Sequence, residues 1–367
     1  PFTFQLLTRS GRISYDDLKL LDPHFGDTVD RWCMQKATGT PSFVAPPPMF
    51  TPMKLCNLTL PNHIVLSPIA TCPSQNGIPG DERPYQNLAL SGAGLILTEP
   101  IAISPEARIT PDDAGMYEAN HLTTWAHIVQ SIHTNSLAKI AIQLNHAGRR
   151  GSTRPRLQGL DRPLRQGNWP LLSASPIPYT SQGQVPKEMD RADMDRVCQH
   201  FVRAAQMAHE ANFDLLQLNF AHGYLLASFI SPLTNQRTDE HGGDLEHRLR
   251  FPLEIFDSVR IIWPADKPIS VSLTVTDCIK GGLDIEDAVI VSKILKSHGC
   301  DILMVLAGQT TPDGEPSYGR GFLTPLSERI RNEAGIPTIV GGYLTTTNEV
   351  NTIIVAGRAD FCIMNLL

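Results

Sequence analysis

Asp214-Leu215-Leu216-Gln217-Leu218 runs directly into Asn219-Phe220-Ala221-His222-Gly223-Tyr224. The first segment has the apolar character of a buried strand, and the second supplies an amide, an imidazole and a phenol within a short loop. Polar groups at the carboxyl end of a barrel strand are placed to bind and protonate a small molecule. The stretch therefore predicts a parallel α/β barrel with a reactive site after this strand.

The rest of the chain repeats the same rhythm of short apolar runs and amphipathic stretches. The expected strands are Ile64–Ser67, Gly94–Glu99, Lys139–Asn145, Asp214–Leu218, Ile269–Thr274, Ile302–Leu306, Thr338–Gly341 and Phe361–Met364. The expected helices are His121–Thr134, Arg191–Ala211, Leu245–Ile262, Ile285–His298, Pro325–Ala334 and Thr347–Ala356. Eight strands alternating with helices predict an α/β fold of the (β/α)8 TIM barrel type. A doubly wound sheet is the alternative, and the absence of G-x-G-x-x-G after the first strand weakens it.

Two domains follow from this pattern, an N-terminal extension and linker over residues 1–48 and the barrel over residues 49–367. Within the extension, Asp22–Lys36 fits a helix and Gly39–Pro48 a Pro-rich linker. The sequence ends after the eighth strand, so the usual last helix is missing. We expect the helix within residues 14–37, or a partner chain, to cover part of the seam between the last and first strands. A C-terminus cut from a longer protein is the alternative.

Composition excludes several classes of protein. The formal net charge of −6 argues against a nucleic-acid partner. No apolar run approaches the roughly 20 residues of a membrane span, and no signal-peptide core is present. The seven cysteines form no C-x-x-C pair, so neither a metal site nor a disulfide framework is indicated, and reduced thiols in the cytoplasm are expected. The expected partner is a small-molecule substrate, and a homo-oligomer remains open.

Several motifs resemble those of the old yellow enzyme family of FMN-dependent ene-reductases. They are Phe50-Thr51-Pro52 with Leu58–Val65, Ser91–Gly94, Ser104–Arg108, Gln143–Arg149, His222-Gly223-Tyr224 and Gly357–Asp360. The likeness covers residues 49–367 in order, and it implies the same barrel. A narrower likeness, in Gly308–Asp313, Tyr318–Arg320, Arg329–Ile336 and Thr8–Tyr15, is to the C-terminal barrel of bifunctional salicylyl-CoA hydroxylases. It implies a barrel detached from a monooxygenase partner.

The resemblance assigns catalytic roles to residues after the fourth strand. Two polar residues three apart grip the substrate carbonyl in that family, and a nearby Tyr delivers a proton. Here these are Asn219, His222 and Tyr224. Both side chains of the pair can donate to an oxygen. The alternative is that Asn219 and His222 only tie down a loop.

The resemblance also locates an FMN site, which departs from the family pattern. Ser272 stands where an Arg faces the flavin, and Asn365 and Leu366 stand where Gly-Arg holds the phosphate. Ala70 and Cys72 occupy positions near flavin N5. Pro68, Gln143, Gly341 and Gly342 are the retained cofactor-binding positions. Losing two Arg contacts would cost roughly 3–6 kcal/mol, unless Arg149, Arg150, Arg320 or Lys187 compensates.

These departures lead to the expectation of a redox-neutral enzyme. Asn219, His222 and Tyr224 would isomerise or cyclise an unsaturated carbonyl compound, with FMN vestigial or lost. The first alternative is an FMN-dependent ene-reductase that uses NAD(P)H, and the second is a non-catalytic pseudoenzyme. The irregular, basic segment Ala147–Gln184 is expected to be a lid that sets the substrate.

Overall fold

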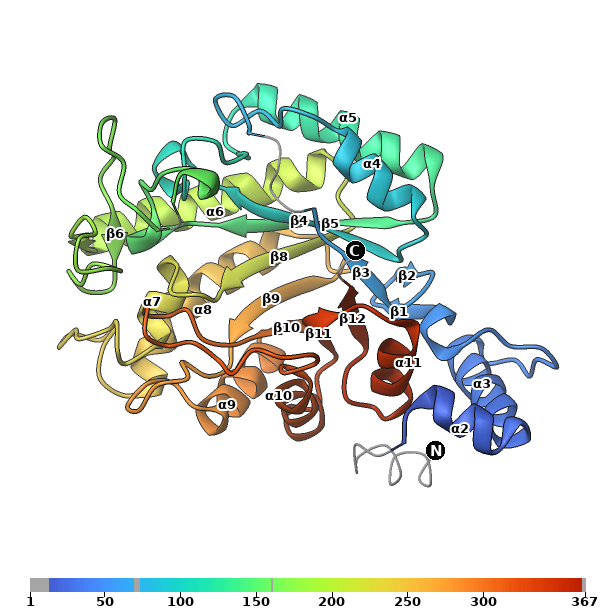
Figure 1. The fold of residues 1–367 in the computed structure, drawn as a ribbon. Helices are drawn as coiled ribbons and strands as arrows, with labels where there is room; N and C mark the ends of the chain where they lie inside the picture. Colours follow the sequence, from blue (N-terminus) through green and yellow to red (C-terminus); the bar gives the residue numbers. More distant parts are fainter. Residues whose placement is uncertain (1–12, 69–72, 160, 365–367) are drawn as a thin grey trace.

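Eight parallel strands close into a barrel in the residues that the computed structural model describes, which are 13–68, 73–159 and 161–364 (Figure 1). The strands are β3 (Ile64–Leu66), β4 (Leu95–Ala102), β5 (Lys139–Asn145), β8 (Leu215–Phe220), β9 (Ile269–Thr274), β10 (Ile302–Leu306), β11 (Thr338–Leu344) and β12 (Phe361–Met364). They follow one another around the barrel in chain order, and β12 closes it by pairing with β3. The predicted (β/α)8 barrel is confirmed.

Helices on the outside connect the strands. They are α4 (Arg83–Leu90), α5 (Ala119–Asn135), α6 (Arg191–Glu210), α7 (Leu225–Ile230), α8 (Leu245–Ile262), α9 (Ile285–Ser297), α10 (Thr324–Arg329), which continues as the π-turn η5 (Ile330–Ala334), and α11 (Thr347–Val355). Local signals explain where some of them begin: Asp190 and Asp193 form a capping box at α6, and Thr346 and Glu349 form one at α11. Among the described helices, none combines the length and hydropathy that a membrane crossing requires.

The barrel interior changes from apolar to polar along its axis. An apolar cluster fills one end, and it includes Leu55 and Leu60 from the hairpin of β1 (Met53–Leu55) and β2 (Leu58–Leu60). Farther along, the register of β8 and β9 pairs Gln217 with Ser270 and Asn219 with Ser272. Inward-pointing residues in such barrels pack in layers, and the layer nearest the carboxyl ends faces the active site. The register therefore brings a polar layer to the mouth of the barrel.

The N-terminal extension packs against the barrel through its two described helices, α2 (Tyr15–Leu21) and α3 (Pro23–Thr38). Tyr15, Leu18, Val29 and Cys33 form a small core with Val355 of α11. In Figure 1 the two blue helices lie beside the red α11. The principal contacts are thus with the helix that precedes β12, one element earlier than the seam that the sequence led us to expect.

Candidate active site

The carboxyl ends of the barrel strands gather the predicted site residues. Asn219 lies near the end of β8, Ser272 in β9, Gln143 in β5 and Gly341 with Gly342 in β11, while Pro68 follows β3. His222 and Tyr224 lie in the loop between β8 and α7. Ala70, Cys72, Asn365 and Leu366 lie outside the described residues. Carboxyl strand ends share one face of a parallel barrel, so the described candidates meet at one mouth.

The carboxamide of Asn219 has a fixed orientation. Its Oδ1 accepts hydrogen bonds from the backbone N–H of Ala221 and from the hydroxyl of Ser272, both at 3.0 Å. A backbone N–H can only donate, so the oxygen of the amide must be the atom that faces it. Within the described residues Nδ2 makes no hydrogen bond. The amide therefore keeps both N–H donors for a ligand.

His222 is held in a tight turn. Its φ is +55°, its N–H donates to the Thr274 hydroxyl at 2.9 Å, and Gly223 follows with φ +67°. A Cβ at position 223 would lie 2.7 Å from the carbonyl oxygen of Thr310, so only glycine fits there. Burial, together with the nearby Arg150 cation, lowers the pKa of His222 to about 3. At neutral pH the ring is thus uncharged and has one N–H to donate.

Tyr224 is the N-cap residue of α7 and lies two residues after His222 in the chain. Burial raises the pKa of its phenol above the usual value. The guanidinium carbon of Arg150 lies 5.2 Å from the centre of the ring. Tyr224 consequently remains protonated at neutral pH, as a proton donor must.

The lid between β5 and α6 is attached to the barrel by two neighbouring arginines. It contains the 3-10 turns η3 (Gly148–Arg150) and η4 (Arg156–Gln158) and the short strand β6 (Leu172–Ser173), which pairs with β7 (Lys187–Glu188). Arg149 Nη2 donates to the carbonyl of Thr310 at 2.6 Å, and Arg150 Nη1 donates to that of His222 at 2.7 Å. Arg150 also pairs with Asp161 at 2.9 Å. Both cations are thus engaged within the protein.

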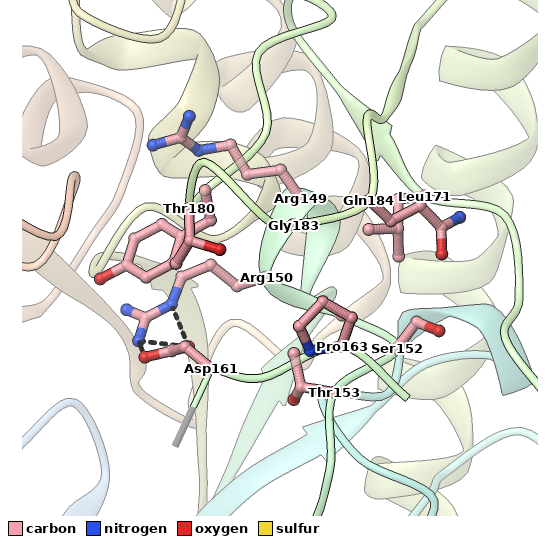
Figure 2. Close-up of a pocket in the computed structure, with 12 residues that line it drawn as sticks. Arg149, Arg150, Ser152, Thr153, Asp161, Pro163, Leu171, Thr180, Gly183 and Gln184 are labelled. Atoms are coloured by element: carbon pink, nitrogen blue, oxygen red, sulfur yellow. Dashed lines mark hydrogen bonds and ion pairs between the residues drawn. The ribbon is translucent and has the colours of Figure 1, made fainter. Parts of the chain in front are cut away.

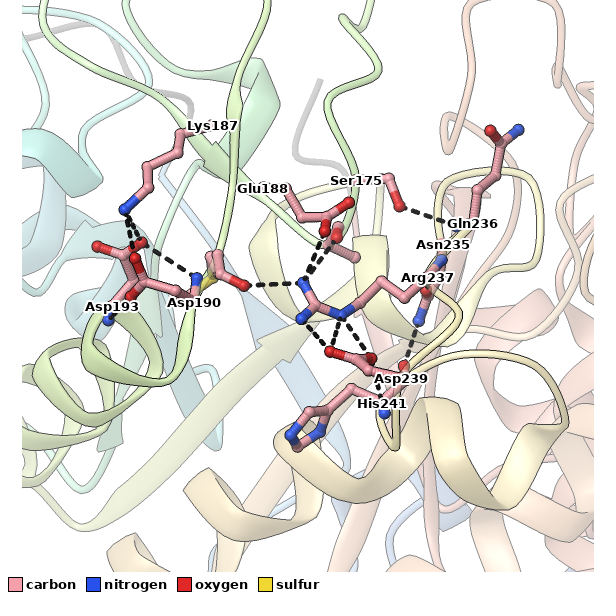
Figure 3. A network of polar contacts seen from close by, with 12 residues as sticks. Ser175, Lys187, Glu188, Asp190, Asp193, Asn235, Gln236, Arg237, Asp239 and His241 are labelled. Carbon is pink, nitrogen blue, oxygen red and sulfur yellow. Dashed lines mark hydrogen bonds and ion pairs between the residues drawn. The ribbon is translucent and has the colours of Figure 1, made fainter.

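The other two compensating cations that the sequence suggested are also paired. Lys187 Nζ binds Asp190 at 2.8 Å and Asp193 at 2.6 Å, in a network at the start of α6 (Figure 3). Arg320 lies 3.7 Å from Glu349, and its side chain is largely exposed. Neither contact places a cation against Ser272.

Arg237 forms structural ion pairs at the barrel rim. It donates to the carbonyls of Ala174 at 3.1 Å and Met189 at 2.8 Å and forms a forked pair with Asp239 (Figure 3). Asp277 likewise serves structure, since its carboxylate accepts from the Leu283 N–H at 2.7 Å. These groups hold the loops around the site without entering it.

Residues 48–365 match the NADH:flavin oxidoreductase / NADH oxidase family. The chain belongs to this family. The NADPH dehydrogenases of Geobacillus sp. (strain WCH70) and Bacillus subtilis (strain 168) are 34% and 33% identical over 316 residues, which is 85% of this chain and 88% of each relative. The structure of morphinone reductase superposes with a TM-score of 0.70 at 24% identity, over 86% of this chain and 85% of that one, which shows the shared fold.

Family membership argues against the redox-neutral enzyme that the sequence led us to expect. The curated relatives are NADPH dehydrogenases, so an oxidoreductase is better supported than the redox-neutral isomerase or cyclase that the altered FMN positions suggested. That expectation gave too much weight to five substituted positions, four of which lie outside the described residues. The narrower likeness to salicylyl-CoA hydroxylases is not shown by these comparisons and stays a prediction.

Sequence reasoning missed part of the site. Thr274, which holds the His222 backbone, and Asp161 and Tyr179 of the lid, which flank Arg150, were not singled out. Thr274 ends β9, so its place at a barrel strand end was the available signal. The lid residues carry no periodic pattern that could have indicated them.

Proposed function

We propose that this chain is an FMN-dependent enzyme that oxidises NADPH and reduces the carbon–carbon double bond of an α,β-unsaturated carbonyl compound. Family membership and the NADPH dehydrogenase relatives support the cofactor pair. The polar layer at the barrel mouth supports the substrate class. A redox-neutral reaction at the same residues is the second candidate.

The fixed amide of Asn219 carries the proposal. Its free N–H donors and the one N–H of the neutral His222 ring come from residues three apart at the end of β8. Two neutral donors directed at one carbonyl oxygen stabilise the negative charge that develops there when hydride reaches the β-carbon. Tyr224 then gives its proton to the α-carbon.

The described residues also fit the flavin ring. Gln143 is almost fully buried, yet its Nε2 makes only a 3.5 Å contact with the Thr98 carbonyl, so most of its amide hydrogen-bonding capacity is unused. A buried amide with unused capacity suits the polar edge of a planar ring. Gly342 has φ +103° and a Phe322 ring carbon 3.1 Å from where a Cβ would be, and its backbone would approach the phosphate end. FMN, when bound, supplies the hydride that it receives from NADPH.

Ser272 contacts the amide of Asn219, so we infer a role for it in substrate binding and not in flavin binding. Its hydroxyl proton is committed to Asn219. We therefore assign Ser272 to orienting the substrate-binding amide, and we assign Pro68, Gln143, Gly341 and Gly342 to holding FMN.

Half-reactions followed separately test this function. Anaerobic NADPH should bleach the flavin absorbance of the purified protein, and an enone such as cyclohex-2-enone should restore it. Asn219→Ala should weaken the second step while leaving the first in place. Conversion of an unsaturated carbonyl compound to an isomer without consumption of NADPH would instead support the redox-neutral candidate.

A further inference from the structure

Arg150 is a buried cation at the junction of three loops. It lies in η3 directly after β5, and only 5% of its surface is exposed. Its Nη1 donates to the carbonyl of His222 at 2.7 Å and to that of Gln309 at 3.2 Å. The guanidinium thus connects the loop after β5 with the loops after β8 and β10.

The lid supplies the groups that hold this cation in place. Asp161 accepts from Nε at 3.2 Å and from Nη2 at 2.9 Å, and the ring of Tyr179 lies 4.1 Å from the guanidinium carbon. Figure 2 shows the forked pair with Asp161 beneath the lid segment that carries Thr180 and Gly183. A planar guanidinium that is paired on its edge and stacked on its face has little freedom to move.

The same guanidinium also lies near the proposed proton donor. Its central carbon lies 5.2 Å from the Tyr224 ring. When Tyr224 loses its proton it becomes an anion in a desolvated place, which is costly unless a cation is near. Of the titratable groups that act on Tyr224, Arg150 favours the phenolate, whereas the carboxylates of Asp113 and Asp161 and the phenol of Tyr179 disfavour it. His222 is neutral and adds no charge.

We propose that Arg150 is a positioning residue that stabilises the phenolate left on Tyr224, and that the lid holds it there through Asp161 and Tyr179. The inference rests on the proposed function. The O–H bond of Tyr224 breaks, the proton bonds to the substrate carbon beside the carbonyl, and water later returns a proton to the phenolate. The hydride comes from the reduced flavin. Proton transfer from Tyr224 is then fastest when Asp161 and Tyr179 of the lid contact Arg150.

Two substitutions that each break the ion pair between Arg150 and Asp161 distinguish an effect of charge from an effect of structure. Arg150→Met removes the cation, so the pKa of the phenol at position 224 should rise by roughly 1 unit or more. Asp161→Asn removes the negative charge, but its amide oxygen can still accept from the guanidinium, which the carbonyls of His222 and Gln309 also hold. Arg150 should therefore stay in place, and this pKa should fall. If the ion pair only held the loops together, both substitutions would shift the pKa of this phenol in the same direction.

The readout is the ¹⁹F chemical shift of 3-fluorotyrosine incorporated in place of Tyr224, followed against pH. It requires neither substrate nor turnover, so its outcome is separate from that of the proposed function. Arg154→Met is the matched control, because Arg154 is a lid arginine that donates to the Pro163 carbonyl at 3.2 Å. Arg150→Lys keeps the charge, so its transition should stay close to that of the unsubstituted protein.

The proposal stands if Arg150→Met raises the pH midpoint of the ¹⁹F shift and Asp161→Asn does not raise it. It is overturned if Arg150→Met leaves the transition in place or lowers it, or if Asp161→Asn raises it as well. If Arg150→Met does not fold, the test rests on Arg150→Lys and Asp161→Asn. A higher pH midpoint of the ¹⁹F shift in either variant contradicts the proposal.

Discussion

The hydroxyl of Ser272 on β9 donates a hydrogen bond to the carboxamide oxygen of Asn219 on β8 at 3.0 Å. The two residues are direct partners in the strand register, so the contact is fixed by the barrel itself. It leaves the amide N–H donors of Asn219 unpaired within the described residues. A serine at this position therefore fixes the amide orientation and leaves its N–H side open to a ligand.

Replacing this hydroxyl should weaken substrate binding without unfolding the barrel. In Ser272→Ala, Asn219 retains the Ala221 N–H but loses one of the two contacts that fix its amide. Losing a contact worth about 0.5–1.5 kcal/mol should lower kcat/KM for an enone by roughly two- to tenfold, mostly through KM. Steady-state kinetics with an enone measure this effect.

Ser270→Ala is the matched control. Ser270 is two residues earlier on β9, is equally buried, and accepts from Gln217 Nε2 at 3.0 Å. Its loss should reduce stability and leave the KM for the enone unchanged. Equal increases in KM for both variants would show that Ser272 acts through general packing.

The fold follows from the sequence because each barrel strand is a buried apolar run between polar loops. Even the strand Asp214–Leu218 was placed within two residues of the observed Leu215–Phe220. Helices α4 and α7 were missed. Helix α7 has only six residues, fewer than two turns, so it shows no periodicity.

The site was only partly visible in the sequence, because contacts between distant residues decide it. Ser272 was interpreted as a neutral substitute for a flavin-binding cation, and its partner Asn219 lies 53 residues away. The two residues meet only through the register of β8 and β9. Arg150 was likewise treated as a free loop cation, whereas the lid residue Asp161 pairs with it.

Removing the phenol of Tyr224 should separate the two half-reactions. Tyr224→Phe takes away the proton donor, so reoxidation of the flavin by an enone should slow by roughly 10²–10⁴-fold. Bleaching by NADPH should proceed at the original rate. Stopped-flow absorbance resolves both steps. Tyr117→Phe, which changes a phenol packed against His121, should alter neither rate, and an unaffected oxidative step in Tyr224→Phe would assign proton delivery to another group.

Acidification should destabilise the protein through two histidines. Burial lowers the pKa of both His146 and His222 to about 3, whereas an unfolded histidine titrates near 6.5. Between these values the unfolded state binds more protons, so the free energy of unfolding falls as the pH falls. The slope is at most about 1.4 kcal/mol per pH unit for each histidine.

Denaturant unfolding between about pH 7 and about pH 5 measures this slope. His222→Asn should reduce this slope by the contribution of one histidine. A slope that is unchanged in His222→Asn would show that this ring binds protons equally in the folded and unfolded protein.

The buried Arg237 should matter far more to stability than the exposed Arg191, although both form forked ion pairs. The side chain of Arg237 is 6% exposed, and its loss leaves the carbonyls of Ala174 and Met189 without this donor. The side chain of Arg191 is 50% exposed beside Asp195 and Glu254, where water can replace it.

Arg237→Met should therefore lower the free energy of unfolding by roughly 1–3 kcal/mol, against about 0–1 kcal/mol for Arg191→Met. Because Arg237 joins the lid to the loop after α7, its loss should also increase cleavage of the lid by trypsin. Urea unfolding and limited proteolysis test both effects. Equal losses of stability in the two variants would mean that water replaces Arg237 at the carbonyls of Ala174 and Met189, since only buried acceptors make the loss of the donor costly.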